Sequence, residues 1–168
     1  MKRIIVTLLV VAILASMVGI GYAVHTPRSG VAQLETASPP TAEGMLKLVN
    51  DERAKVGVKP LVIHETLNKS AQFKADDMYK NNYFSHTAPG TNDNNGLNYL
   101  DSIDDGLCSH VGENITDNLV SIDNTSEQSV YNWIHSPAHY KAMIDPKNTL
   151  TGFGISGTKI VQHFCVTK

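Results

Sequence analysis

The most informative stretch of the chain covers residues 133–140 and reads WIHSPAHY. Apolar residues at helix spacing around Trp133 predict a helix over residues 126–134, with the indole packed in the core. Ser136-Pro137 is typical of a helix N-cap followed by the first helical position, so a second helix is expected over residues 137–144. The capping role accounts for Ser136 better than a nucleophile does, because no elbow motif surrounds it.

The same break separates two histidines that resemble a metal-binding pair. His135 and His139 are four residues apart, the spacing of zinc ligands on one continuous helix. Because Ser136-Pro137 places them on different helical pieces, we do not expect them to share a metal. His135 is therefore expected at the surface.

Two more helices are predicted upstream. The first begins at a Thr41 cap and ends before Gly57. The second carries an apolar stripe from Leu67 to Met78 and ends at Asn81-Asn82. Residues 88–98 are dense in Pro, Gly, Asn and Asp and are predicted to form a loop, with a short helix over residues 97–103.

The C-terminal residues indicate β-structure. Residues 151–156 and 159–166 alternate in polarity around Gly157-Thr158, which predicts a hairpin. Helices followed by strands favour an α+β domain whose helices pack on a small sheet.

The N-terminal segment predicts export. After the basic start Lys2-Arg3, residues 4–24 are almost wholly apolar and carry no charge. The segment is long enough for a membrane anchor, which needs about 20 residues, but Gly21-Tyr22-Ala23 also permits signal-peptide cleavage. Both alternatives place the rest of the chain outside the cytoplasm, extracellular or at the cell surface. Residues 25–40 are rich in Ser, Thr and Pro and are expected to be a flexible linker before a domain at 41–168.

Composition and charge limit the possible partners. The chain is 42% hydrophobic and 18% charged, as expected for a folded domain. Its formal net charge is −2, and the exported part is more acidic because Lys2 and Arg3 lie before it. No Lys/Arg cluster is present, which argues against nucleic acid and anionic lipid as partners. Contact with a membrane is expected only through the N-terminal segment.

Two cysteines, Cys108 and Cys165, are present. In an oxidising compartment the default for such a pair is a disulfide. A metal-binding cysteine pair is the alternative, but it would need a much shorter spacing.

Three further motifs accompany the stretch at 133–140. They are Phe84-Ser85-His86, Gly112-Glu113-Asn114-Ile115, and an upstream run of Asn50 and Arg53 followed by Gly57 and Pro60-Leu61. In this order and spacing, the four motifs resemble the bacterial branch of the CAP superfamily (cysteine-rich secretory proteins, antigen 5 and pathogenesis-related proteins). The resemblance covers residue 41 to the C-terminus.

The resemblance implies an α-β-α sandwich with a central cleft. In many members the cleft holds two His and two Glu that can bind a divalent cation such as zinc. His86, Glu113 and His139 match three of these positions, whereas Ser136 occupies the position of the second Glu. Two imidazoles and one carboxylate are the ligand set of open catalytic zinc sites. The alternative is a metal-free cleft in which Glu113 is hydrogen-bonded between the two histidines.

Three functions are compatible with these residues. The first is a binding module at the cell envelope for a small hydrophobic, glycan or peptide ligand. The second is a metal-assisted hydrolase of peptide or cell-wall substrates, with Glu113 as the candidate catalytic base if burial raises its pKa. The third is a structural surface protein with a vestigial cleft. The loss of a carboxylate at Ser136 favours the first function over the second. His64, His110 and His163 belong to no motif.

Overall fold

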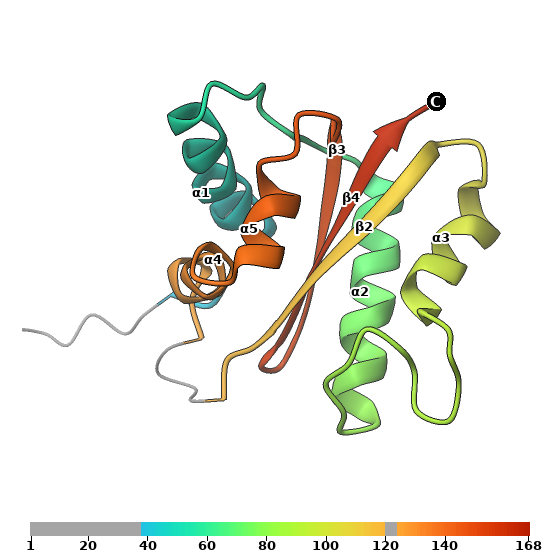
Figure 1. Cartoon of the computed structure of the whole chain (residues 1–168). Coiled ribbons are helices and arrows are strands. Elements are labelled where there is room, and N and C mark those ends of the chain that lie inside the picture. Colours follow the sequence, from blue (N-terminus) through green and yellow to red (C-terminus); the bar gives the residue numbers. More distant parts are fainter. Residues whose placement is uncertain (1–37, 120–123) are drawn as a thin grey trace, which may run out of the picture. The chain divides into compact units, whose positions relative to one another are not determined.

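The computed structural model describes residues 38–119 and 124–168 (Figure 1). The predicted anchor or signal peptide and most of the predicted linker lie outside these residues. Within the described residues, no helix combines the length and the hydropathy needed to cross a bilayer.

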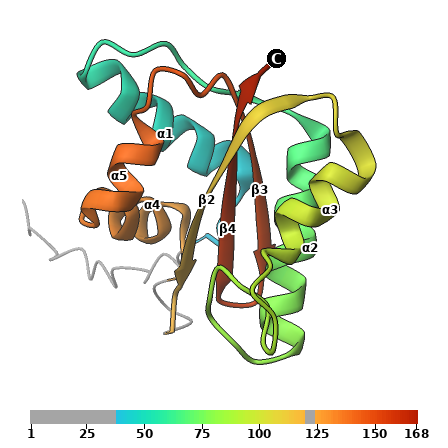
Figure 2. The ribbon, with the colours of Figure 1, turned by 45° about the vertical axis from the view of Figure 1, so that its right-hand side comes forward.

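In the part of the chain that the structure describes, five helices and four strands form three layers. The helices are α1 (Ala42–Lys55), α2 (Glu65–Lys80), α3 (Asn95–Asp104), α4 (Ser126–Ile134) and α5 (Pro137–Met143), and the strands are β1 (Val62–Ile63), β2 (Cys108–Asp117), β3 (Leu150–Ser156) and β4 (Lys159–Thr167). The sheet order is β1-β3-β4-β2, with β1 parallel to β3 and the other pairs antiparallel. Figures 1 and 2 show α1, α4 and α5 on one face of the sheet and α2 and α3 on the other. The predicted α+β sandwich is confirmed.

The predicted helices and the hairpin are present with small changes at their ends. At the start of α1, the Thr41 hydroxyl accepts a hydrogen bond from the Gly44 amide at 3.0 Å, as expected for an N-cap. The predicted loop at residues 88–98 is wrong in its last residues, because α3 begins at Asn95. The side chain of Asn94 caps α3 by accepting bonds from Gly96 and Leu97.

The upstream motif has a structural role. The Asn50 side chain accepts a bond from the Leu61 amide at 2.8 Å and donates one to the Leu61 carbonyl at 3.0 Å. Arg53 is fully buried, and its guanidinium donates to four backbone carbonyls. These belong to Lys59, Met143, Asp145 and Asn148. The motif thus ties α1 to the end of α5 and to the segment before β3.

Two glycines let α2 lie directly on the sheet. A Cβ atom at Gly152 would approach the backbone of Leu67 and Asn68 to 2.2 Å, and one at Gly154 would approach the backbone of Ala71 to the same distance. Because β3 has no side chains at these points, α2 packs closely against it. This contact places Ser70 of α2 beside His163 and Lys74 of α2 beside the His86 carbonyl.

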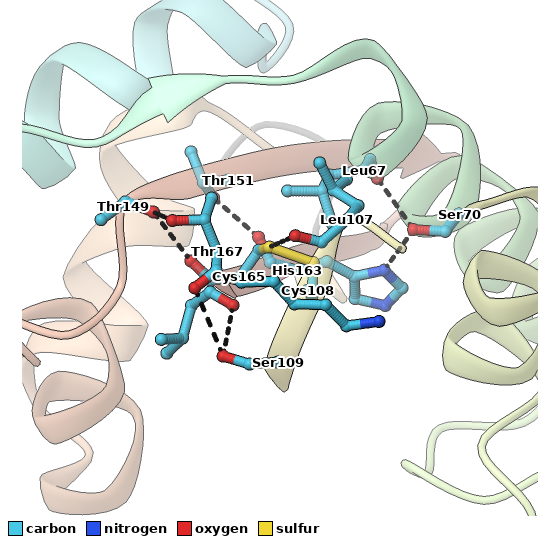
Figure 3. The surroundings of a disulfide bond; sticks show 12 residues. Leu67, Ser70, Leu107, Cys108, Ser109, Thr149, Thr151, His163, Cys165 and Thr167 are labelled. Carbon is cyan, nitrogen blue, oxygen red and sulfur yellow. Dashed lines mark hydrogen bonds between the residues drawn. A yellow bond between two sulfur atoms is a disulfide. The ribbon is translucent and has the colours of Figure 1, made fainter. Parts of the chain in front are cut away.

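The predicted disulfide is confirmed. Cys108, the first residue of β2, is bonded to Cys165 of β4, with a Cα–Cα distance of 5.4 Å (Figure 3). Cys165 is fully buried and packs in a small cluster with Leu67 and Leu100. The bond therefore fixes the start of β2 to the interior strand of the sheet.

Candidate functional site

Glu113 and Asn114 connect the edge strand β2 to both helical layers. Successive side chains of a strand point to opposite faces of the sheet. Glu113 lies opposite His163 of β4, whose ring contacts Ser70 of α2. The Asn114 side chain instead donates to the His139 carbonyl of α5 at 3.1 Å.

The Glu113 carboxylate is buried and fully hydrogen-bonded. Its side chain is 3% exposed. Oε1 accepts from His86 Nδ1 at 2.7 Å and from the side-chain amide of Asn94 at 2.7 Å. Oε2 accepts from His163 Nε2 at 2.9 Å. Since an ionised carboxylate can only accept, both ring nitrogens carry a proton. His86 and His163 thus hold the carboxylate from two sides.

These bonds decide the ionisation of Glu113. Burial alone would raise the pKa, but the hydrogen bonds from His163 and His86, together with the charges of His163 and Lys74, lower the pKa of Glu113 to about 2. The carboxylate is therefore ionised at neutral pH and a poor proton acceptor. Glu113 therefore does not have the raised pKa that a catalytic base at this position would need.

Sequence reasoning missed His163. Its ring is fully buried, and Nδ1 shares a 2.7 Å hydrogen bond with the Ser70 hydroxyl (Figure 3). His163 takes the place beside Glu113 that was expected for His139. The register of β2 against β4 reveals this pair, because Glu113 and His163 are direct cross-strand neighbours.

His86 is held through its backbone as well as its ring. It lies in the loop between α2 and α3, and its side chain is 53% exposed. The ammonium of the buried Lys74 donates to the His86 carbonyl at 3.0 Å and to the Tyr83 hydroxyl at 3.2 Å. Tyr83 in turn donates to Asp77 of α2. Lys74 and Asp77 therefore anchor this loop to α2.

His139 lies beside His86 but is not joined to Glu113. The ring centroids of His86 and His139 are 6.5 Å apart. Burial, and then the neighbouring His86, lower the pKa of His139, so its ring is neutral at neutral pH. Among the described residues, neither ring nitrogen of His139 has a hydrogen-bond partner.

A cavity of about 340 Å³ opens beside His139. Ile115 and Trp133 line it at depth, and Ser136 and His139 contribute from the start of α5. Trp133 is fully buried and belongs to the core, as predicted, and it is also part of this wall. The remaining lining residues are Phe84, Thr116, Asp117, Leu119 and Asn132.

The order of the motifs and this three-layer fold agree with a match to one family model. Residues 46–167 match the model of CAP, described as the cysteine-rich secretory protein family. The chain belongs to the CAP family.

Relatives support the assignment. The chain is 35% identical over 128 residues to the uncharacterized Bacillus subtilis protein YkwD, covering 71% of this chain and 45% of that protein. It therefore spans less than half the length of this curated relative. A solved extracellular SCP-domain protein of Bacillus anthracis has a TM-score of 0.64 at 22% identity, covering 74% of this chain and 39% of the other. An outer surface protein of Borrelia burgdorferi has a TM-score of 0.63 at 22% identity, covering 75% of this chain and 94% of the other. Both structures share the fold.

The CAP residues of this chain do not form a ready metal site. Within residues 38–119 and 124–168, no three His, Cys, Asp or Glu side chains are grouped so that they could hold a metal ion. A zinc ion bound to one ring nitrogen lies roughly 3 Å from the ring centroid, so rings 6.5 Å apart could share one only in an almost linear arrangement. Zinc prefers tetrahedral ligands, and Glu113 is already occupied by three donors. The expected His₂Glu set does not fit zinc as it stands.

Ser136 is the residue at the position where the resemblance to CAP proteins implies a second Glu. It is the N-cap residue of α5 and is followed by Pro137, as predicted. Its hydroxyl, however, makes no capping hydrogen bond, which corrects the expected role of the side chain. Ser136 is also one of the residues that line the cavity.

Proposed function

We propose that this CAP domain works outside the cytoplasm as a binding module, and that its cavity takes a small ligand at the cell envelope. The export-type N-terminal sequence and the disulfide support the location, since disulfides persist in oxidising compartments. The extracellular and outer surface proteins that share its fold are consistent with this location.

One observation carries the choice of binding over catalysis. An open cavity of about 340 Å³ lies next to His139, while the carboxylate of Glu113 is committed to three hydrogen bonds. Such a volume is within the range of small-molecule sites. A general base needs a pKa near the working pH, whereas the pKa of Glu113 is about 2. We assign Glu113 the task of positioning His86.

The binding test uses the one tryptophan of the chain. The full ¹⁵N-labelled chain is placed in lipid nanodiscs, because detergent would compete for an apolar cavity. Small hydrophobic molecules, oligosaccharides and peptides are added while the indole N–H signal of Trp133 is followed by NMR. At least one class should shift this signal saturably.

Matched variants show where the ligand binds. Ser136→Phe fills the cavity and should abolish the shift while thermal unfolding stays cooperative. Ser102→Phe, at an exposed position of α3 outside the cavity, should bind as the wild type does. Binding that survives Ser136→Phe, or a signal that no class moves, would contradict the proposal.

The hydrolase alternative is tested with peptide and peptidoglycan substrates, with and without a chelator. We expect no turnover above the level of the Glu113→Gln variant. Metal analysis of protein purified without an affinity tag should show less than one equivalent of metal, unchanged in the His86→Ala/His139→Ala double variant. Stoichiometric metal that the double variant loses would restore the metal-dependent interpretation.

A further inference from the structure

We propose that the cavity selects an uncharged ligand, which places an apolar group between Phe84 and Leu119 and a polar group against Ser136 and His139. This inference rests on the proposed function, because it names the class of ligand for the same cavity. Its chemical class is a small neutral amphiphile with an alcohol, amide or ester group.

The first support is the neutralised charge of the wall. Asp117 lines the cavity, and its two oxygens are both used: Oδ1 accepts from the Thr158 hydroxyl at 2.6 Å and Oδ2 accepts from the Lys159 ammonium. The ammonium and the carboxylate are each about nine-tenths buried. A charged ligand would therefore lose its hydration in the cavity and find no free countercharge in this wall.

The second support is the set of polar groups in the wall that remain free. Asn132 donates to Thr116 at 3.0 Å and to Asn118 at 3.1 Å, and it accepts from Gln128. Among the described wall residues, this leaves the Ser136 hydroxyl, the His139 ring and the buried Trp133 Nε1–H without hydrogen-bond partners from side chains. A hydroxyl and a neutral imidazole can each donate and accept. They match a ligand group that both donates and accepts hydrogen bonds, such as an amide. At Ser136, this chain has a hydroxyl where the resemblance to CAP proteins implies a carboxylate.

The third support is the apolar mouth of the cavity. Leu119 is 82% exposed and Phe84 is 49% exposed, although both line the cavity. Ile115, 4% exposed, continues the apolar wall inwards. Covering exposed apolar side chains favours binding of an apolar group, so the ligand's chain belongs at the mouth and its polar group against Ser136 and His139.

The test compares three probes with the same six-carbon backbone at pH 8, in nanodiscs, with the Trp133 indole signal as the readout. Hexanamide is neutral, hexanoate is an anion and hexylammonium is a cation. We expect hexanamide to bind at least about tenfold more tightly than either ion, since an unpaired buried charge is costly. Equal or tighter binding of either ion overturns the inference.

Charge variants reverse the selection. Lys159→Met leaves the Asp117 carboxylate unpaired in the wall, so hexylammonium should gain affinity relative to hexanamide. Asp117→Asn frees the ammonium, and hexanoate should gain instead. If neither variant changes the order of the probes, the Asp117–Lys159 pair does not control selectivity and the inference fails.

The contribution of the mouth is measured separately. Leu119→Ser should weaken hexanamide several-fold, whereas Val62→Ser, a change at an exposed residue outside the cavity, should not. If no probe moves the indole signal but a glycan or peptide does, the inference fails and the binding function stands. If no compound of any class moves it, both fail.

Discussion

At the scale of single residues, Glu113 shows how hydrogen bonding can outweigh burial. A carboxylate removed from water normally becomes a weaker acid. Here, donors from His86, Asn94 and His163 satisfy both oxygens, and the charged form is the stable one. Glu113 is therefore a fixed negative charge that orients its neighbours.

The pH dependence of stability follows from this shift. Because the folded-state pKa of Glu113 is lowered from 4.5 to about 2, its contribution is fully present above about pH 5 and is lost as the pH falls towards 2. The shift corresponds to roughly 3 kcal/mol of unfolding free energy. Urea denaturation of the wild type and Glu113→Gln from pH 7 to pH 2.5 measures it.

The variant should be less stable than the wild type at pH 7, and the difference should shrink on acidification. A difference that stays constant across this range would show that the charge of Glu113 does not stabilise the fold.

The site was only partly predictable from sequence, for a physical reason. The motifs located His86 and Glu113, which are hydrogen-bonded in the structure. They did not locate His163, because its contact with Glu113 depends on the register between β2 and β4 rather than on any local pattern. His139 was expected beside Glu113, but α5 places it next to His86 instead.

At the scale of elements, the spacing of apolar residues predicted those helices that bury one face. The helices α1 and α2 each bury one stripe, so their sequences carry a clear signal. The strand β2 was missed because its ten residues include only two large aliphatic side chains, Val111 and Ile115. Its polar residues are instead used for contacts with both helical layers, which hides the alternation typical of a strand.

The close contact between α2 and β3 leads to a second prediction. In Gly154→Ala the new methyl group would lie 2.2 Å from the Ala71 backbone, so the helix must move away from the sheet. We expect a loss of at least about 2 kcal/mol of unfolding free energy, near the upper range for overpacking. Chemical denaturation measures the loss.

Gly106→Ala is the matched control, because the atom nearest to its new Cβ would be a side-chain oxygen of Asp104 at 3.6 Å. It should change stability by less than about 0.5 kcal/mol. Equal effects of the two substitutions would mean that α2 does not depend on the bare surface of β3.

At the scale of the whole molecule, the disulfide and the Arg53 contacts secure opposite parts of the sandwich. Cys108–Cys165 fixes β2 to β4, while Arg53 joins α1 to carbonyls around the end of α5. The cavity is lined by residues of β2, α4 and α5. The sequence pointed to both the cysteines and Arg53. It predicted the bonding partner only for the cysteines.

Removal of the disulfide should be costly. The bond closes a separation of 57 residues, for which chain entropy gives a loss of about 4 kcal/mol. Cys108→Ser/Cys165→Ser should therefore unfold at a lower urea concentration, and wild type treated with reductant should approach the same midpoint. A thiol probe should label the denatured wild type only after reduction, and labelling before reduction would contradict the bond.

The buried Lys74, which contacts the loop that carries His86, affects how small molecules reach the cavity. Swinging this loop outwards would separate the Lys74 ammonium from the His86 carbonyl and the Tyr83 hydroxyl, leaving a buried cation without acceptors. We therefore expect this loop to stay in place and not to open and close over the cavity. We expect small molecules to enter and leave the cavity without movement of this loop, at rates set by diffusion and by the strength of their contacts.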